Sequence, residues 1–207
     1  MLFAILFSVL TTLSDGMFHT QYETEVMASA DTCNVVIDSM IYYLQTDPEK
    51  LSKHFFAGLG KQDDVKKNAF YLIWKKSEYL PEKQYSQLVL DVLVNEKPFL
   101  RNVVIDSQVT DSVQGAQRDI RVDIRYAGTL IKEAYGTFHV LPSSEKGAKV
   151  GIDVHVRFGW FFCIFISRKV YSETIDWRLV RFIQNIKLTA EGLDVSDDYW
   201  ECPNGTK

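Results

Sequence analysis

The stretch that decides the fold is VGIDVHVRF at residues 150–158, in which apolar and polar side chains alternate almost without exception. Strict alternation over this length is typical of a β-strand with one buried face and one solvated face. Two more alternating stretches precede it, at residues 118–126 and 130–141. Three such strands joined by short turns predict an antiparallel meander.

The alternation also predicts how these strands pair. A turn after residue 141 places Gly136 opposite Val154, and a three-residue loop at 127–129 places Val122 opposite Ala134. Both registers bring the apolar side chains of all three strands onto one face. A slip of one residue would move a whole set of side chains to the other face, so the agreement favours this meander.

The opposite face of the predicted meander is polar. We interpret it as a solvated face with cross-strand charge pairs. The enzymatic alternative is an acid–base group made of Glu133, Tyr135 and His155. The side chains predicted on this face are Arg121, Asp123, Arg125, Glu133, Tyr135, Asp153, His155 and Arg157.

The apolar face has unusually small side chains at its centre, Ala134 and Gly136. Small residues flanked by larger ones leave a depression, and protein interiors pack densely enough that something must fill it. Three fillings stay open: the closing helix, the aromatic rings of Trp177 or Phe182, or an apolar ligand. If the filling is a ligand, the candidate binding residues are Val122, Ala134, Gly136, Phe138, Val154, Val156, Leu179 and Ile183.

N-terminal to the meander, the sequence predicts one strand followed by helices. Residues 17–28 alternate and form the opening strand. A helix follows with Asp31 as its N-cap, and a short second helix begins at Pro48, because proline suits the first helical position. A third helix is predicted from Asp63 to Lys76, where apolar residues recur at steps of three and four.

The remaining elements surround the meander. Two strands are predicted at residues 88–94 and 99–110. The continuous apolar run Phe158–Ile166 predicts a buried strand and, within it, a buried thiol at Cys163. A closing amphipathic helix at residues 174–190 completes the domain.

The chain divides into three parts: an apolar N-terminal segment at 1–16, a single α+β domain at 17–192, and an acidic C-terminal tail at 193–207. Residues 1–13 are too short to span a bilayer and lack the basic start of a signal peptide. We retain three interpretations of them: a signal or anchor without its basic start, an apolar helix packed on the domain, or a docking segment that contacts a membrane or a protein. They favour an extracytoplasmic or membrane-tethered location over a cytoplasmic one.

Composition excludes several classes of function. Of 207 residues, 46% are hydrophobic and 24% are charged, which excludes intrinsic disorder. The net charge is −4 and no basic stripe is present, so nucleic-acid binding is not expected. The three cysteines form neither a disulfide framework nor a zinc pattern, and no cofactor, metal or catalytic motif is present.

The order of elements resembles the helix-grip superfamily, which includes START domains and Bet v 1-like proteins. The resemblance rests on the opening strand Tyr22-Glu23-Thr24-Glu25-Val26, the helix from Asp31, the meander at 118–158 and the closing helix at 174–190. The chain departs from the superfamily in three ways: five strands after the helices instead of six, a longer helical region at 62–80, and the extra N-terminal segment.

The resemblance implies an antiparallel sheet curving around a long C-terminal helix, with two or three helices after the first strand and a cavity for a lipid- or sterol-like molecule. We therefore expect non-catalytic binding of a hydrophobic small molecule. The alternatives are a structural or protein-interaction domain with a filled core, and a cyclase- or hydratase-like enzyme using His155 and Tyr135. The oligomeric state is left open.

Overall fold

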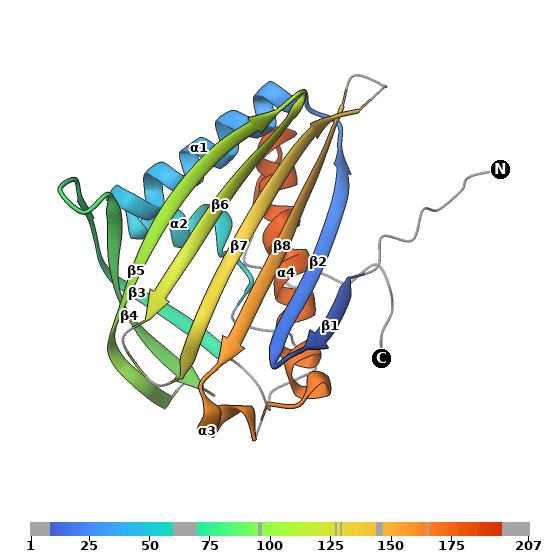
Figure 1. Ribbon diagram of the computed structural model, residues 1–207. Helices are drawn as coiled ribbons and strands as arrows, with labels where there is room; N and C mark the ends of the chain where they lie inside the picture. Colours follow the sequence, from blue (N-terminus) through green and yellow to red (C-terminus); the bar gives the residue numbers. More distant parts are fainter. Residues whose placement is uncertain are drawn as a thin grey trace.

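A long antiparallel sheet carries the fold. The computed structural model describes residues 9–59, 70–94, 97–126, 128, 130–143, 147–164 and 166–195. Within them, eight strands form one antiparallel sheet in the order β1-β2-β8-β7-β6-β5-β4-β3, so that β8 returns to pair with β2 (Figure 1). The strands are β1 Leu10–Ser14, β2 Met17–Val26, β3 Phe70–Leu80, β4 Tyr85–Val94, β5 Lys97–Gln114, β6 Gln117–Tyr126, β7 Ile131–Pro142 and β8 Ala148–Phe158.

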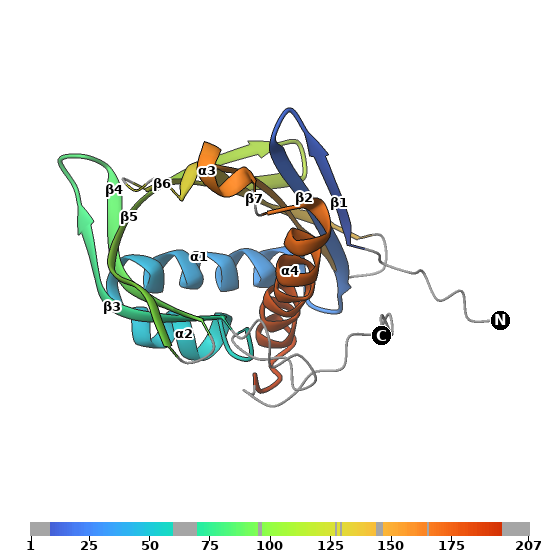
Figure 2. The same ribbon diagram turned by 90° about the horizontal axis from the view of Figure 1, so that it is seen from below.

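The helices lie on the concave side of this sheet. Figure 2 shows the sheet curving around α1 (Ala30–Thr46) and α4 (Arg168–Ala190). α4 contacts β1, β2 and β8, whereas α1 contacts β7 and β8 and reaches β3 and β4. The fold is therefore α+β, an antiparallel sheet curved around a long C-terminal helix, as predicted.

Local sequence explains where the first two helices begin. Ser29 caps α1, because its Oγ accepts a hydrogen bond from the Thr32 N–H at 3.2 Å. The prediction of Asp31 as the cap is wrong by two residues, and Asp31 instead lies in the first turn, where an acid suits the helix dipole. α2 (Pro48–Phe55) begins as predicted, with Pro48 in its first turn and Asp47 as its cap.

The predicted third helix is not confirmed. Its first part lies in residues 60–69, outside the described residues, and Phe70–Leu80 forms β3, paired with β4 through a bulge between Trp74 and Lys76. Six strands therefore follow the helices, not five. Helical spacing in a short apolar stretch does not exclude a strand, and here the backbone of β4 supplies hydrogen-bond partners that decide the outcome.

The predicted buried strand at 158–166 is also wrong. β8 ends at Phe158, and Trp160–Cys163 forms the short helix α3. Trp160 is 82% exposed and Cys163 is exposed as well, so the thiol is not buried. β7 begins at Ile131, opposite Phe158, and one more backbone hydrogen bond runs from the Gly159 N–H to the Leu130 carbonyl at 3.0 Å before the chain turns into α3.

The strand registers confirm one pairing and correct another. Gly136 lies opposite Val154, as predicted. Val122 lies opposite Gly136 rather than Ala134, so the β6–β7 pairing is shifted by two residues from the predicted register. A two-residue shift keeps every side chain on its predicted face, because side chains along a strand alternate with a period of two.

The ends of the domain differ from the expected boundaries. Leu10–Ser14, assigned by sequence to the N-terminal segment, forms β1 and pairs with β2 across a two-residue turn. Asp15 and Gly16 in this turn have φ of 50° and 73°, the left-handed conformation that a tight hairpin requires. The segments 1–8 and 196–207 lie outside the described residues, so the three interpretations of residues 1–13 stay predictions.

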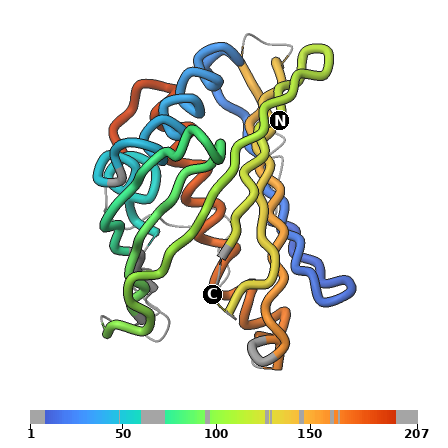
Figure 3. Tube along the Cα trace, turned by 60° about the vertical axis from the view of Figure 1, so that its left-hand side comes forward, coloured from blue at the N-terminus to red at the C-terminus, as the bar shows by residue number. Residues whose placement is uncertain are grey.

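The other end of the sheet carries a projecting hairpin. Figure 3 shows the β5–β6 hairpin extending past its neighbours. Near its turn, Arg118 lies opposite Val113, and its nitrogens are within hydrogen-bond distance of Asp111 on β5 and of Asp38 on α1. Among the described helices, none is long and apolar enough to cross a membrane.

Candidate ligand-binding site

A row of directly opposed residues crosses the concave face of the sheet. From β5 to β2 it comprises Val109, Val122, Gly136, Val154 and Thr20. Neighbouring strands lie about 4.8 Å apart, so the row spans roughly 19 Å. Gly136 stands at its centre, where the sheet carries no side chain.

No side chain of β7 occupies the concave face at Gly136, and a Cβ built there would make only ordinary van der Waals contacts. A Cβ built on Gly136 would lie 3.8 Å from both the Asp153 carbonyl oxygen and Val154 Cγ2, and 3.9 Å from Ile152 Cδ1. All three atoms belong to β8, and among the described residues no helix side chain comes closer. Gly136 therefore has room for a Cβ at ordinary contact distance, and the ligand depression predicted over it stays a prediction.

Apolar side chains on the concave face fall into two groups. Toward one end of the strands, near the loop between β7 and β8, they are buried: Ile120, Phe138, Val140, Val150 and Ile152. From the row of Gly136 toward the other end, most are only half-buried: Val109, Val122, Ile124, Val154 and Val156. We call this second group the open half of the concave face. Ala134 lies among them, although its own small side chain is buried.

Aromatic packing accounts for the covered half. Phe182 on α4 contacts Phe138, with ring centroids 5.9 Å apart, and Phe56, with centroids 5.2 Å apart. Phe56 in turn contacts Trp74 of β3 at 5.4 Å. Phe182 therefore packs on Phe138, two residues along β7 from Gly136, and none of its atoms is among the three nearest a Cβ built on Gly136.

The predicted site residues divide between the two halves. Phe138, Leu179 and Ile183 belong to the buried core cluster. Val122, Gly136, Val154 and Val156 line the open half with Ala134 between them. Leu179 and Ile183 contact the buried core and not the open half, because α4 lies over β1, β2 and β8, to one side of Gly136.

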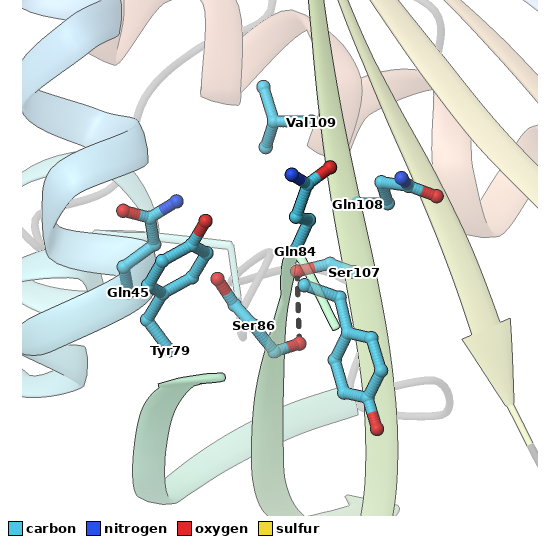
Figure 4. A pocket seen from close by; sticks show the side chains of 8 residues that line it. Gln45, Tyr79, Gln84, Ser86, Ser107, Gln108 and Val109 are labelled. Carbon is cyan, nitrogen blue, oxygen red and sulfur yellow. Dashed lines mark hydrogen bonds between the residues drawn. The ribbon is translucent and has the colours of Figure 1, made fainter. Parts of the chain in front are cut away.

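A polar hollow adjoins one end of the row. It has a volume of about 180 Å³ and lies between the C-terminal end of α1 and strands β3, β4 and β5 (Figure 4). Val109 belongs both to this hollow and to the row of Gly136. The described residues that line it are Gln45, Tyr79, Gln84, Tyr85, Ser86, Ser107, Gln108 and Val109.

The amino-acid sequence alone does not reveal this hollow. Its floor is Ser86 and Ser107, which lie opposite each other and are 1% and 2% exposed. Both serines occupy inward positions of strands whose other inward residues, such as Leu88, are apolar. Serine at an apolar position of an alternating strand was the available signal.

The proposed acid–base residues lie on the other face of the sheet. Tyr135 and His155 are on the convex face, where their rings stack with centroids 4.4 Å apart. His19 stacks on the second side of His155 at 4.1 Å, and the Arg121 guanidinium lies 3.9 Å from the centre of the Tyr135 ring. Burial, together with the positive charge of a protonated His19, lowers the pKa of His155. Tyr135 and His155 therefore both point away from the open half of the concave face.

A second histidine of the convex face bridges two strands. His139 Nδ1 lies 2.8 Å from Asp119 Oδ1, and its Nε2 lies 2.8 Å from Asp153 Oδ2. The hydrogen bond to Asp153, reinforced by Asp119, outweighs partial burial and raises the pKa of His139 to about 9. Within the described residues, no cluster of three or more His, Cys, Asp or Glu side chains is arranged to hold a metal ion.

Buried polar side chains of α4 attach this helix to the segment after α2. Arg178 Nε donates to the Leu59 carbonyl at 2.9 Å, and Asn185 Nδ2 donates to the carbonyls of Phe55 and Ala57 at 3.0 and 2.9 Å. Burial lowers the pKa of Arg178 to about 10. These contacts hold α4 against residues 55–59, while the valines of the open half stay half-buried.

Comparison with known proteins identifies the fold. No family model matches the sequence, and no curated protein matches it. Among solved structures, the chain is similar to the ZhuI aromatase/cyclase from Streptomyces sp. R1128, with a TM-score of 0.54 and 14% identity over 84% of this chain and 94% of that one. It is similar to a conserved protein from Geobacillus kaustophilus, with a TM-score of 0.53 and 11% identity over 84% and 95%.

A third similar structure is norcoclaurine synthase from Thalictrum flavum, with a TM-score of 0.50 and 16% identity over 89% of this chain and 88% of that one. Together with the observed order of strands and helices, these similarities show that the chain has the helix-grip fold of START and Bet v 1-like proteins. Identities this low establish the fold and not the activity.

Proposed function

We propose that this protein binds a hydrophobic small molecule, of lipid or sterol character, on the open half of the concave face, without chemical change. The observation that supports the proposal is the absence of a side chain at Gly136, where a built Cβ would make only ordinary van der Waals contacts, none closer than 3.8 Å. Half-buried valines surround it, so a bound apolar molecule would remove their remaining apolar surface from water, which favours binding.

Two of the similar structures are enzymes by name, so the fold alone does not separate binding from catalysis. What favours binding is the side chains available on the concave face. The row around Gly136 presents valines and one buried threonine, and the candidate acid–base pair Tyr135 and His155 lies on the convex face. General acid–base chemistry needs a titratable group within hydrogen-bond reach of the reacting atoms.

The test is to fill the space over Gly136 with a larger side chain and to measure ligand binding. Purified, delipidated protein is titrated with the uncharged apolar dye Nile red and, by thermal shift, with decanoic acid, cholesterol and phosphatidylcholine. Gly136→Leu places a branched side chain over the centre of the row and should weaken Nile red binding at least tenfold. Its stability should stay within about 1 kcal/mol of wild type, because a Cβ meets only ordinary van der Waals contacts there and glycine itself disfavours a strand interior.

Thr137→Leu is the matched control, since it places the same side chain on the convex face one residue along β7. It should leave Nile red binding unchanged. Equal dye affinity in wild type and Gly136→Leu, with both proteins folded, would place the site elsewhere. A wild-type protein that responds to none of these probes would contradict the proposal altogether.

A further inference from the structure

The polar hollow beside Val109 is placed to receive one end of an elongated ligand. Val109 and Gly136 belong to the same row, two strands apart, which corresponds to roughly 10 Å. An apolar body lying over Gly136 and Val122 would therefore bring its end to the hollow. Ser107 is the next inward residue of β5 after Val109 and forms part of the floor.

The lining of the hollow is polar but uncharged. Its described side chains are glutamines, tyrosines, serines and Val109, and none of them is acidic, basic or a histidine. Figure 4 shows Gln45 beside the ring of Tyr79, with Gln84 and Ser86 contributed by the β3–β4 hairpin and the start of β4. A charged group placed here would lose water without gaining a counter-charge, whereas hydroxyl, amide and carbonyl groups would find donors and acceptors.

Ser86 is the buried group that points to a ligand. Its side chain is 1% exposed and lines the hollow, and its Oγ has no hydrogen-bond partner among the described residues. The neighbouring Ser107 hydroxyl donates to the Ser86 backbone carbonyl at 3.4 Å rather than to its side chain. A buried hydroxyl without a partner costs free energy, which a ligand atom at hydrogen-bond distance would recover.

From this geometry we infer that the ligand is an amphiphile with an uncharged, hydrogen-bonding head group, which binds in the hollow against Ser86. This inference rests on the proposed function, because the apolar body lies over the open half of the concave face. A volume of about 180 Å³ is smaller than the pockets that hold whole drug-sized ligands, and it is sufficient for a small head group such as a hydroxyl or an amide.

Three probes with the same ten-carbon chain test the inference: 1-decanol, decanoate and decyltrimethylammonium. Each competes against Nile red at pH 7.5, with 1-decanol kept below its aqueous solubility and the two ionic probes below their micellar concentrations. Each competition is measured on wild type, Ser86→Ala and the control Ser112→Ala. Ser112 is an exposed serine of β5 outside the hollow. A head group bound to Ser86 predicts that Ser86→Ala weakens 1-decanol roughly 2- to 12-fold, the range of one neutral hydrogen bond.

The affinities of decanoate, decyltrimethylammonium and Nile red should change less than twofold in Ser86→Ala, and Ser112→Ala should match wild type for every probe. Unchanged 1-decanol affinity in Ser86→Ala would overturn the inference. A higher Tm of the ligand-free variant would then mean that the Ser86 hydroxyl is only an unpaired buried group and binds no head group. Decanoate competing more strongly than 1-decanol on wild type would overturn it too. Absence of Nile red binding to wild type would instead refute the proposed function, and this inference with it.

Discussion

The bridge formed by His139 makes stability depend on pH in a defined direction. Both ring nitrogens of His139 lie 2.8 Å from carboxylate oxygens, of Asp119 on β6 and Asp153 on β8. Only the doubly protonated imidazolium can donate both hydrogen bonds. The charged form therefore ties three neighbouring strands together, and deprotonation removes one of the two donors.

The direction follows from the pKa of His139, which rises from about 6.5 to about 9 on folding. A raised pKa stabilises the folded state fully below about pH 6.5, and this stabilisation is lost as the pH rises through 9. The full increase corresponds to roughly 3 kcal/mol. The His139 side chain is 30% exposed and those of Asp119 and Asp153 are 20% and 26% exposed, so solvent screening reduces the expected loss to about 1–2 kcal/mol.

The lowered pKa values of Asp119 and Asp153 set the acidic limit of the pH range in which the His139 bridge stabilises the fold. The hydrogen bond from His139 lowers the pKa of Asp153 against the effect of burial. Burial opposes ionisation of Asp119 as well, but hydrogen bonds from Gln117 and His139 still hold its pKa below the usual range. Lowered carboxyl pKa values stabilise the folded state above about pH 4, and this contribution is lost as the pH falls through the folded-state values.

Urea denaturation at pH 5, 6.5, 8 and 9.5 measures the effect, on wild type and on His139→Gln. The free energy of unfolding of wild type should fall by about 1–2 kcal/mol more than that of His139→Gln between pH 6.5 and 9.5, with similar m-values. His155→Gln is the matched control on the same face. Because the pKa of His155 is lowered, its protonation in the unfolded chain destabilises the fold below about pH 6.5, the opposite direction.

The reasoning would be refuted if His139→Gln and wild type lost stability in parallel between pH 6.5 and 9.5. The lowered pKa of His155 predicts that wild type loses more free energy of unfolding than His155→Gln between pH 6.5 and 5. Equal losses in the two proteins would contradict the opposite pKa shifts of His139 and His155.

Two further predictions follow from buried groups. Asn185→Ala removes the donor shared by the carbonyls of Phe55 and Ala57 and should lower the free energy of unfolding by about 2–4 kcal/mol in urea denaturation; a loss below 1 kcal/mol would mean that water replaces the amide. Iodoacetamide should modify Cys163, which is exposed, and spare Cys33, which is fully buried and whose pKa burial raises to about 11. Peptide mass spectrometry of the native protein would contradict this if Cys33 were alkylated first.

Much of the fold could be predicted from local sequence, because side-chain alternation and helix caps are properties of neighbouring residues. The alternation at 150–158 placed Val154 on the concave face and His155 on the convex face, as the structure has them. The β7–β8 register followed from matching two alternating strands across a short turn. The missing side chain at the centre of the concave face, at Gly136, followed from the same match, since it needs only the identity of one inward-facing residue.

Other features required partners that are distant in the chain. Phe70–Leu80 has helical spacing, and it is a strand because β4 satisfies its backbone hydrogen bonds. The apolar run after Phe158 leaves the sheet after the hydrogen bond from Gly159 to Leu130 and forms α3 instead of a strand. In both cases the local pattern was compatible with two structures, and in the first long-range backbone pairing selected one.

The amino-acid sequence by itself determined which side chains face inward, because that depends on a two-residue period that holds wherever the strand lies. Only the tertiary structure decided what covers them. Buried contacts at Asn185 hold α4 against residues 55–57, and α4 lies over β1, β2 and β8. The valines around Gly136 stay half-buried, and Ser86 of β4 lines a polar hollow at the end of their row. Coverage depends on where a distant helix docks, and that is set by packing between elements far apart in the sequence.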